Sequence, residues 1–171
     1  RVQPQSETVW RQADKYGVPK IAYVNKMDRV GADFLAVVEE IKTKLGARAV
    51  PICLPIGAED KFEGIIDLIA NKAIYYDGGE ELVNYELREI PENMKAEAAA
   101  WREKLVEAAA DYDDTLMEKF FEDPDSITED ELIAALRKAT IDMSIVPACC
   151  GSSFKNKGVQ FLLDAVMRYL P

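Results

Sequence analysis

Hydrophobic positions near the start of the chain alternate between helical and strand-like spacing. The pattern predicts a short helix over residues 6–16, which Gly17 is placed to end. Residues 21–24 form an apolar run rich in strand-forming side chains, so a buried strand is expected there. Apolar side chains at three- and four-residue spacing then predict an amphipathic helix closed by Gly46. Its apolar positions are Phe34, Val37, Val38, Ile41 and Leu45.

The middle of the chain has short apolar segments separated by turn residues. The expected strands cover residues 50–56, 64–69, 73–76 and 85–90. Short links between consecutive strands, including a turn at residues 77–79, predict a small and mainly antiparallel sheet. One long helix is then expected over residues 94–121, stopped by Pro124. Thr128 and Glu131 form a capping box that opens a further helix.

The last part of the chain returns to strand–helix alternation. Residues 145–149 predict a short strand, and Pro147 favours an edge position or a strand end. A final amphipathic helix is expected over residues 159–170. The order strand–helix, insertion, strand–helix predicts an α/β fold, with a partial doubly wound parallel sheet interrupted by an α+β insertion. Two strands alone do not complete such a sheet, so the rest of it is expected elsewhere.

Charge is distributed unevenly along the chain. It carries 21 basic and 31 acidic residues, for a net charge of −10, but residues 80–131 alone hold 18 acidic and five basic ones. This asymmetry indicates an inserted unit with its own surface and possible partner. The acidic total argues against an overall nucleic-acid-binding surface. No apolar run approaches the ~20 residues of a membrane-spanning helix.

The strongest chemical signal directly follows the first predicted strand. Ligands of open α/β sheets bind beyond the carboxyl ends of strands, where Asn25, Lys26, Met27 and Asp28 are expected. The Asp28 carboxylate can accept from two adjacent donors of a guanine edge, a donor pair that adenine lacks. The Lys26 stem can lie on the purine face, and Asn25 can reach the purine N7 or tie loops together.

A second turn of small residues follows the last predicted strand. Gly151, Ser152 and Ser153 would let backbone N–H groups approach a ligand carbonyl such as guanine O6. The printed sequence contains no Gly-x-x-x-x-Gly-Lys-Ser/Thr motif, so no residue in it is expected to cradle the β/γ-phosphates or to seat Mg²⁺. We therefore expect guanine recognition in this chain without catalytic residues.

Acidic side chains recur along the long predicted helix opposite its apolar face. Their spacing of three and four residues predicts one continuous acidic stripe. Its members are Glu103, Glu107, Asp111, Asp114 and Glu118. Two interpretations stay open: a solvated helix face, or a docking face for a basic protein.

Cysteine and histidine usage excludes several classes of site. The chain has three Cys and no His, which excludes a zinc finger and Ser-His or Cys-His catalysis. Cys149 and Cys150 are adjacent and Cys53 lies in an apolar run, so all three are expected to be small buried side chains in a reducing cytosol.

Several blocks of sequence closely resemble the bacterial elongation factor G family, and together they cover almost the whole chain. These blocks are residues 4–13, 24–29, 54–59, 62–68 and 150–160. One departure is Ser153, where the family usually has Ala. The resemblance implies the C-terminal part of a GTPase domain over residues 1–47 and 143–171, with an inserted subdomain over residues 48–142. It places the phosphate loop and both switch regions upstream.

The same resemblance implies a ribosome-dependent GTP hydrolase that drives tRNA–mRNA translocation in the cytoplasm. It implies GTP and GDP as ligands, Mg²⁺ only together with the upstream part, and a monomer that contacts the ribosome. The inserted subdomain would face the ribosomal stalk protein, and neither membrane nor sequence-specific nucleic-acid binding is expected. The alternatives are a ribosome-recycling paralogue, and a non-enzymatic docking module with a vestigial nucleotide motif.

Overall fold

A computed structural model describes residues 1–76 and 85–171. The strands are β1 (Ala22–Val24), β2 (Ala49–Pro51), β3 (Cys53–Ile56), β4 (Gly64–Asp67), β5 (Lys72–Tyr76), β6 (Tyr85–Arg88) and β7 (Val146–Cys150). The α-helices are α1 (Pro4–Lys15), α2 (Phe34–Leu45), α3 (Lys95–Ala110), α4 (Asp114–Glu122), α5 (Glu129–Ile141) and α6 (Val159–Tyr169). Single 3₁₀ turns are η1 (Glu59–Lys61), η2 (Glu92–Met94) and η3 (Pro124–Ser126).

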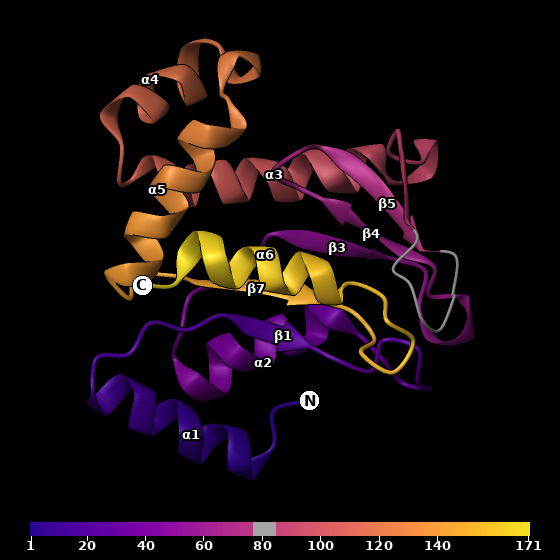
Figure 1. Cartoon of the computed structure of the whole chain (residues 1–171). Helices are drawn as coiled ribbons and strands as arrows, with labels where there is room; N and C mark the ends of the chain where they lie inside the picture. The colour runs from indigo at the N-terminus through magenta and orange to yellow at the C-terminus, as the bar shows by residue number, and fades with distance from the viewer. Residues whose placement is uncertain (77–84) are drawn as a thin grey trace.

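A parallel sheet of order β1-β7-β2 forms the first structural unit. Figure 1 shows α1 and α2 below β1 and β7, with α6 on the other side. The expectation of two parallel strands was wrong, because β2 adds a third by pairing with β7 from Ala49↔Val146 to Pro51↔Ala148. The residues of β2 fall inside the predicted insertion, and the domain boundaries themselves stay a prediction.

β7 is the central strand of this sheet, so the first alternative for Pro147, an edge strand, was wrong, whereas the second, a strand end, agrees with its place as the second residue of β7. Along a strand, successive residues direct their N–H and C=O groups to opposite neighbours. The Val146 amide donates to Arg48 O on the β2 side, so the nitrogen of Pro147 faces β1. However, β1 begins at Ala22, opposite Ala148. The missing donor therefore lies just before the first paired residue of β1 and costs the ladder no hydrogen bond.

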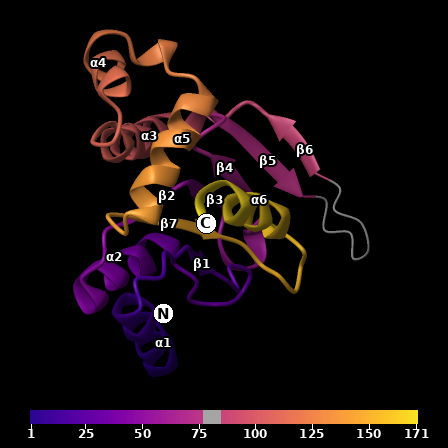
Figure 2. The same cartoon turned by 60° about the vertical axis from the view of Figure 1, so that its left-hand side comes forward.

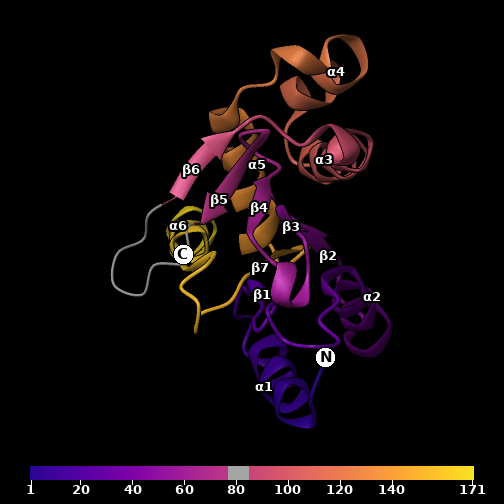
Figure 3. The same cartoon turned by 90° about the vertical axis from the view of Figure 1, so that its right-hand side faces the viewer.

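An antiparallel sheet of order β3-β4-β5-β6 forms the second unit, as the short links predicted. The expected single strand over residues 50–56 was wrong, since Ile52 separates β2 and β3 and the two strands enter different sheets. Figure 3 shows the parallel sheet below and the antiparallel sheet above it. In this view α2 and α3 lie on one side of the strands and α6 on the other. The predicted turn at residues 77–79 lies outside the described residues.

The long helix predicted over residues 94–121 was also wrong, because it is two helices. α3 ends at Ala110, and the Asp113 carboxylate caps α4 by accepting from the amides of Thr115 and Leu116. Such a cap starts a new helix because it satisfies amides that the preceding turn leaves free. Figure 2 shows α4 above α3 rather than in line with it.

The remaining helix signals are confirmed. Thr128 and Glu131 form both bonds of the capping box at the start of α5. Gly46 ends α2 in the left-handed conformation, with φ at 65°. One continuous core connects both sheets and includes Phe34, Ile66, Leu105 and Tyr169, all essentially buried. Within the described parts of the chain, none of the helices has both the length and the apolar character needed to cross a bilayer.

Candidate guanine-binding site

Two loops leave neighbouring strands at the same edge of the parallel sheet. β1 and β7 are paired in register at Val24↔Cys150, so the residues after each strand lie side by side. The Gly151 amide donates to Val24 O at 3.0 Å, and the Met27 amide donates to Gly151 O at 3.1 Å. The two predicted site segments are therefore joined by backbone hydrogen bonds at the carboxyl end of the sheet, where ligands bind in this fold class.

Asn25 links the two loops through its side chain. Its Oδ1 accepts from the amides of Lys26 at 2.8 Å and Ser153 at 2.9 Å, and its Nδ2 donates to Ser153 Oγ at 2.8 Å. This is the second of the two roles expected for Asn25. Ser153, which departs from the usual Ala, supplies the hydroxyl in this link.

Asp28 is held by the second loop. Ser152 Oγ donates to Asp28 Oδ1 at 2.7 Å, and the Ser152 side chain is completely buried. This hydrogen bond is the main cause that lowers the pKa of Asp28. The carboxylate is therefore kept ionised, which suits an acceptor for two ligand N–H donors.

The two loops enclose a cavity of about 220 Å³. Its lining residues are Asn25, Lys26, Asp28, Arg29, Ser152, Ser153 and Phe154. Of these, Asn25 and Lys26 are exposed. Lys26 has a positive φ of 63°, a backbone conformation that non-glycine residues rarely adopt and that is enriched at ligand sites.

Two members of the predicted set do not line the cavity. Met27 is fully buried in the core and therefore anchors its loop. Gly151 is buried where a Cβ atom would lie 2.3 Å from Lys157 O and 2.5 Å from the Tyr23 hydroxyl, so only glycine fits. The amides expected to face a ligand carbonyl are engaged within the protein: Ser152 N donates to Lys157 O, and Ser153 N to Asn25 Oδ1. That part of the expectation was wrong for these two amides.

Sequence reasoning missed the residues that support the loops from behind. The Glu59 amide donates to Met27 O at 2.9 Å, and its Oε1 accepts from the Gly31 amide at 3.0 Å. Lys157 Nζ donates to Phe62 O at 2.9 Å. The sequence offered one indication of their importance: Glu59 and Lys157 both lie in blocks that resemble the elongation factor family. Nothing in those blocks indicated which residues they contact.

The five acidic residues lie far from this cavity. All five are exposed, but they are divided between α3, its C-cap Asp111, and α4, so the continuous stripe was wrong. Figure 1 places α4 at the opposite end of the molecule from the loop after β7. Asp111 is paired with Arg48 at 3.5 Å, so part of the acidic surface already has a basic partner.

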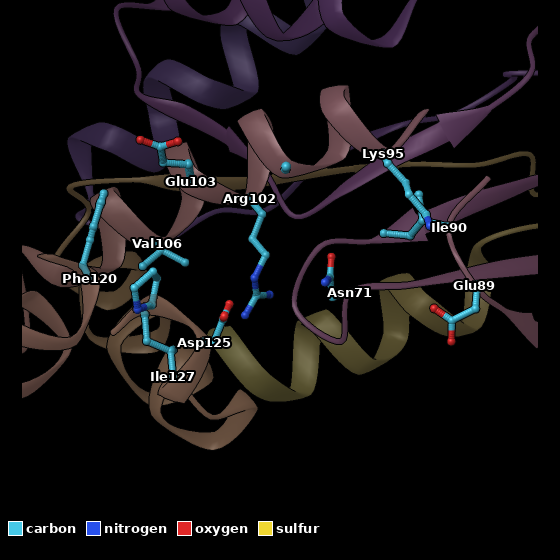
Figure 4. A pocket seen from close by; sticks show the side chains of 12 residues that line it. Asn71, Glu89, Ile90, Lys95, Arg102, Glu103, Val106, Phe120, Asp125 and Ile127 are labelled. Atoms are coloured by element: carbon cyan, nitrogen blue, oxygen red, sulfur yellow. The ribbon is translucent and has the colours of Figure 1, made fainter. Parts of the chain in front are cut away.

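A larger cavity of about 610 Å³ lies between α3, η3 and the ends of β5 and β6. Figure 4 shows Arg102 reaching into it from α3, between Val106 and Asn71. The guanidinium donates to the carbonyls of Leu68 and Ile69, so it stabilises the connection between β4 and β5. Of the predicted site residues, this cavity contacts only Glu103.

The cysteines are buried, as expected. Cys53 Sγ lies 3.7 Å from Cys150 Sγ, and all three thiols are free. Burial raises the pKa of the Cys149 and Cys150 thiols, which keeps them protonated and unreactive. Within residues 1–76 and 85–171, no cluster of three or more acidic or Cys side chains is arranged to hold a metal ion.

Comparisons with known proteins agree on one family. A family model described as "Elongation factor Tu GTP binding domain" matches residues 1–171. Relatives named "Elongation factor G" from Amoebophilus asiaticus and Cytophaga hutchinsonii are 58% and 57% identical over 170 residues. These matches cover 99% of this chain but 24% of each relative, so the chain spans about a quarter of the length of those proteins.

A solved structure is similar over the same extent. A crystal structure of a protein from Thermus thermophilus matches 99% of this chain and 24% of its own, with a TM-score of 0.83 and 29% sequence identity. An experimental structure therefore shares the fold of this chain.

Proposed function

This chain belongs to the family of elongation factor Tu GTP-binding domains, and from that premise we propose that the cavity between residues 25–29 and 152–154 binds the guanine base of GTP and GDP. The observation that carries the proposal is the ionised Asp28 carboxylate, fixed by Ser152 at the carboxyl end of β1. Guanine presents its ring N1–H and its exocyclic amine side by side, and one carboxylate accepts from both. Adenine offers no such pair.

The other residues at the cavity have supporting roles in this proposal. The Lys26 stem lies along the purine face, with its ammonium near the ribose. Both polar atoms of the Asn25 side chain form hydrogen bonds with Ser153. Its role is therefore to hold the two loops at a fixed separation. Met27 anchors the first loop in the core.

We propose that the whole protein is an elongation factor G, a ribosome-dependent GTP hydrolase that drives tRNA–mRNA translocation. The support is the identity of 57–58% to relatives with that name over nearly all of this chain. The residues described here select the base. Phosphate binding is assigned to the upstream part of the domain, because the printed sequence lacks a phosphate-loop motif.

Mg²⁺ does not fit the residues of this chain. A GTPase seats the ion with a phosphate-loop Ser or Thr and an Asp near the β- and γ-phosphates, and the printed sequence contains no phosphate-loop motif to supply the first of these. This chain therefore supplies no group to the hydrolysis step itself. Its part in the reaction is to orient the nucleotide, so that groups outside it act on the γ-phosphate.

The proposed setting is the ribosome in the cytoplasm, with the protein acting as a monomer. The exposed acidic residues of α3 and α4 are proposed to face the ribosomal stalk protein. Exposed charges of this kind raise the rate of encounter more than the final affinity.

The decisive experiment measures nucleotide preference and ribosome-stimulated hydrolysis in the full-length protein. A fluorescent GDP analogue is displaced by GDP or ADP, and phosphate release from GTP is followed with and without ribosomes. We expect displacement by GDP only, and hydrolysis that depends on ribosomes. Equal competition by ADP would contradict guanine recognition, and hydrolysis unaffected by ribosomes would contradict the assignment as a translation factor.

A further inference from the structure

A short segment between β3 and β4 lies directly behind the proposed guanine site. We call residues 57–62 the supporting segment, which contains the 3₁₀ turn η1. It contacts the first site loop through Glu59 and the second through the carbonyl of Phe62. None of its residues lines the 220 Å³ cavity, so it acts on the site from outside.

Glu59 holds the first loop on both sides of Asp28. Its backbone amide donates to Met27 O at 2.9 Å, one residue before Asp28. Its carboxylate accepts from the Gly31 amide at 3.0 Å, three residues after Asp28. The intervening chain is closed by turns in which the Arg29 amide donates to Lys26 O and the Ala32 amide to Arg29 O. One residue thus fixes both ends of the segment that carries the base-reading carboxylate.

Glu59 holds this position in an unfavourable backbone conformation. Its φ is +59°, in the left-handed region that is strained for a non-glycine residue. Gly57 precedes it at φ +76°, where a Cβ atom would lie 2.1 Å from Lys61 O. The tight turn directs both the amide and the carboxylate of Glu59 toward the first site loop. Such a conformation persists only where the surrounding contacts enforce it.

The second loop is held from the same segment. Lys157 Nζ donates to Phe62 O at 2.9 Å, and the Lys157 amide and carbonyl pair with Ser152. Ser152 is the residue that hydrogen-bonds Asp28. The supporting segment therefore contacts both loops whose relative placement aims the Asp28 carboxylate.

We propose that Glu59 is a positioning residue for base recognition, which fixes the Asp28 carboxylate against the guanine edge through Met27 and Gly31. This inference rests on the proposed function of the cavity and adds to it a specificity-determining residue from the antiparallel part of the chain. Glu59 itself does not touch the nucleotide.

The test compares affinities for GDP and IDP in the full-length protein. IDP lacks the exocyclic amine, so the ratio of the two affinities reports how well Asp28 reads that amine. Glu59→Gly removes the carboxylate while adopting positive φ without strain, so it separates the lost contact from a folding defect. We expect GDP affinity to fall about three- to tenfold, as for one lost hydrogen bond, with a smaller fall for IDP.

Two further variants sharpen the result. Glu59→Gln keeps an acceptor oxygen for the Gly31 amide and should stay within about twofold of the parent protein for both nucleotides. Asp60→Asn removes a carboxylate from the exposed adjacent residue of the same turn and should leave both affinities unchanged. Thermal unfolding of each variant confirms that it is folded.

A fall in GDP affinity together with a lower GDP-to-IDP ratio in Glu59→Gly, and its absence in Glu59→Gln, supports the inference. Unchanged GDP affinity in Glu59→Gly, or an equal loss for GDP and IDP, overturns it while leaving guanine binding intact. A parent protein that binds ADP as well as GDP overturns the proposed function itself, which is a separate result from any property of the variants.

Discussion

Among single residues, Asp28 carries the proposed base recognition. Asp28→Asn in the full-length protein should weaken GDP binding and favour XDP, because the Asn amide can donate to the carbonyl that xanthine carries in place of the guanine amine. The loss of a charge-assisted hydrogen-bonded pair should cost about 1.5–3 kcal/mol of GDP binding. Competition between GDP and XDP measures it, and an unchanged preference would mean that Asp28 does not read the base.

A second residue-scale prediction concerns the half-buried carboxylate of Asp67. Burial raises its pKa, although the amides of Ile69 and Ala70 donate to Oδ1. A folded-state pKa above the unfolded value means that the charged form costs stability once the pH exceeds the folded pKa. Asp67→Asn keeps the acceptor oxygen, so it should raise the melting temperature at pH 7.5.

The gain at Asp67→Asn should disappear as the pH falls below the ordinary pKa of an Asp side chain, where the parent carboxyl is also neutral. Each kcal/mol gained corresponds to about 2–4 °C for a chain of this size. Calorimetric melting curves of both proteins at pH 7.5 and near pH 3.5 decide the matter. A difference of equal size at both values would rule out the buried charge as its cause.

At this scale, sequence reasoning named most residues that line the cavity, whose role in guanine binding stays a prediction, but not the hydrogen bonds among them. Asn25, Asp28 and Ser152 were predicted from residue type and from their position after strands. The burial of Met27 and the engagement of the Ser152 and Ser153 amides depend on the register of β1 against β7, which no local pattern encodes. Glu59 was missed for the same reason, since its contacts are with residues 27 and 31.

Among the elements, α3 and α4 show how one residue changes a helix prediction. The apolar spacing continues across residues 111–113, but Asp113 caps α4 and turns the chain. The sequence does contain a helix-start signal here, Asp113 followed by Asp and Thr. The continuous helical spacing of apolar residues led to one long helix being predicted instead. β2 and β3 were merged in the same way, because an unbroken apolar run carries no mark where a chain leaves one sheet for another.

The element-scale prediction concerns the acidic face of α3. Reversal of the exposed Glu107 to Lys should slow association with ribosomes at low salt if this face docks a basic partner, with a smaller effect at high salt. Exposed charges are screened beyond about 8 Å at physiological ionic strength. Glu39→Lys, an equal charge change at an exposed position of α2, is the matched control.

Stopped-flow association at two salt concentrations separates the two interpretations of this face. A slower rate for Glu107→Lys than for Glu39→Lys at low salt supports docking. Equal rates for the two variants would support a purely solvated helix face.

On the scale of the whole molecule, the chain alone should not hydrolyse GTP and should bind GDP weakly. A nucleotide held only by the two proposed base-reading loops would leave its phosphates in solvent with their charge unneutralised, since the printed sequence has no phosphate loop. Phosphate release should equal the buffer background, and calorimetry should detect no micromolar affinity for GDP. Turnover above background would point to a phosphate site within these 171 residues.

The overall topology was only partly accessible from sequence. Strand–helix alternation predicted the parallel sheet, and short links predicted the antiparallel one. Strand order depends on pairing between distant segments, which is why the central position of β7 was missed.

The central position of β7 has a consequence for how the chain acquires its structure. Ala22 pairs with Ala148 and Val50 with Pro147, so neither outer strand of the parallel sheet has a partner until nearly the whole chain is available. β3 to β6 pair only with neighbours in sequence, so they close small loops at low entropic cost. During synthesis, the antiparallel sheet can therefore form while β1 and β2 are still unpaired. The arrival of β7 then completes the parallel sheet and brings together the two loops of the proposed guanine site in a single late step.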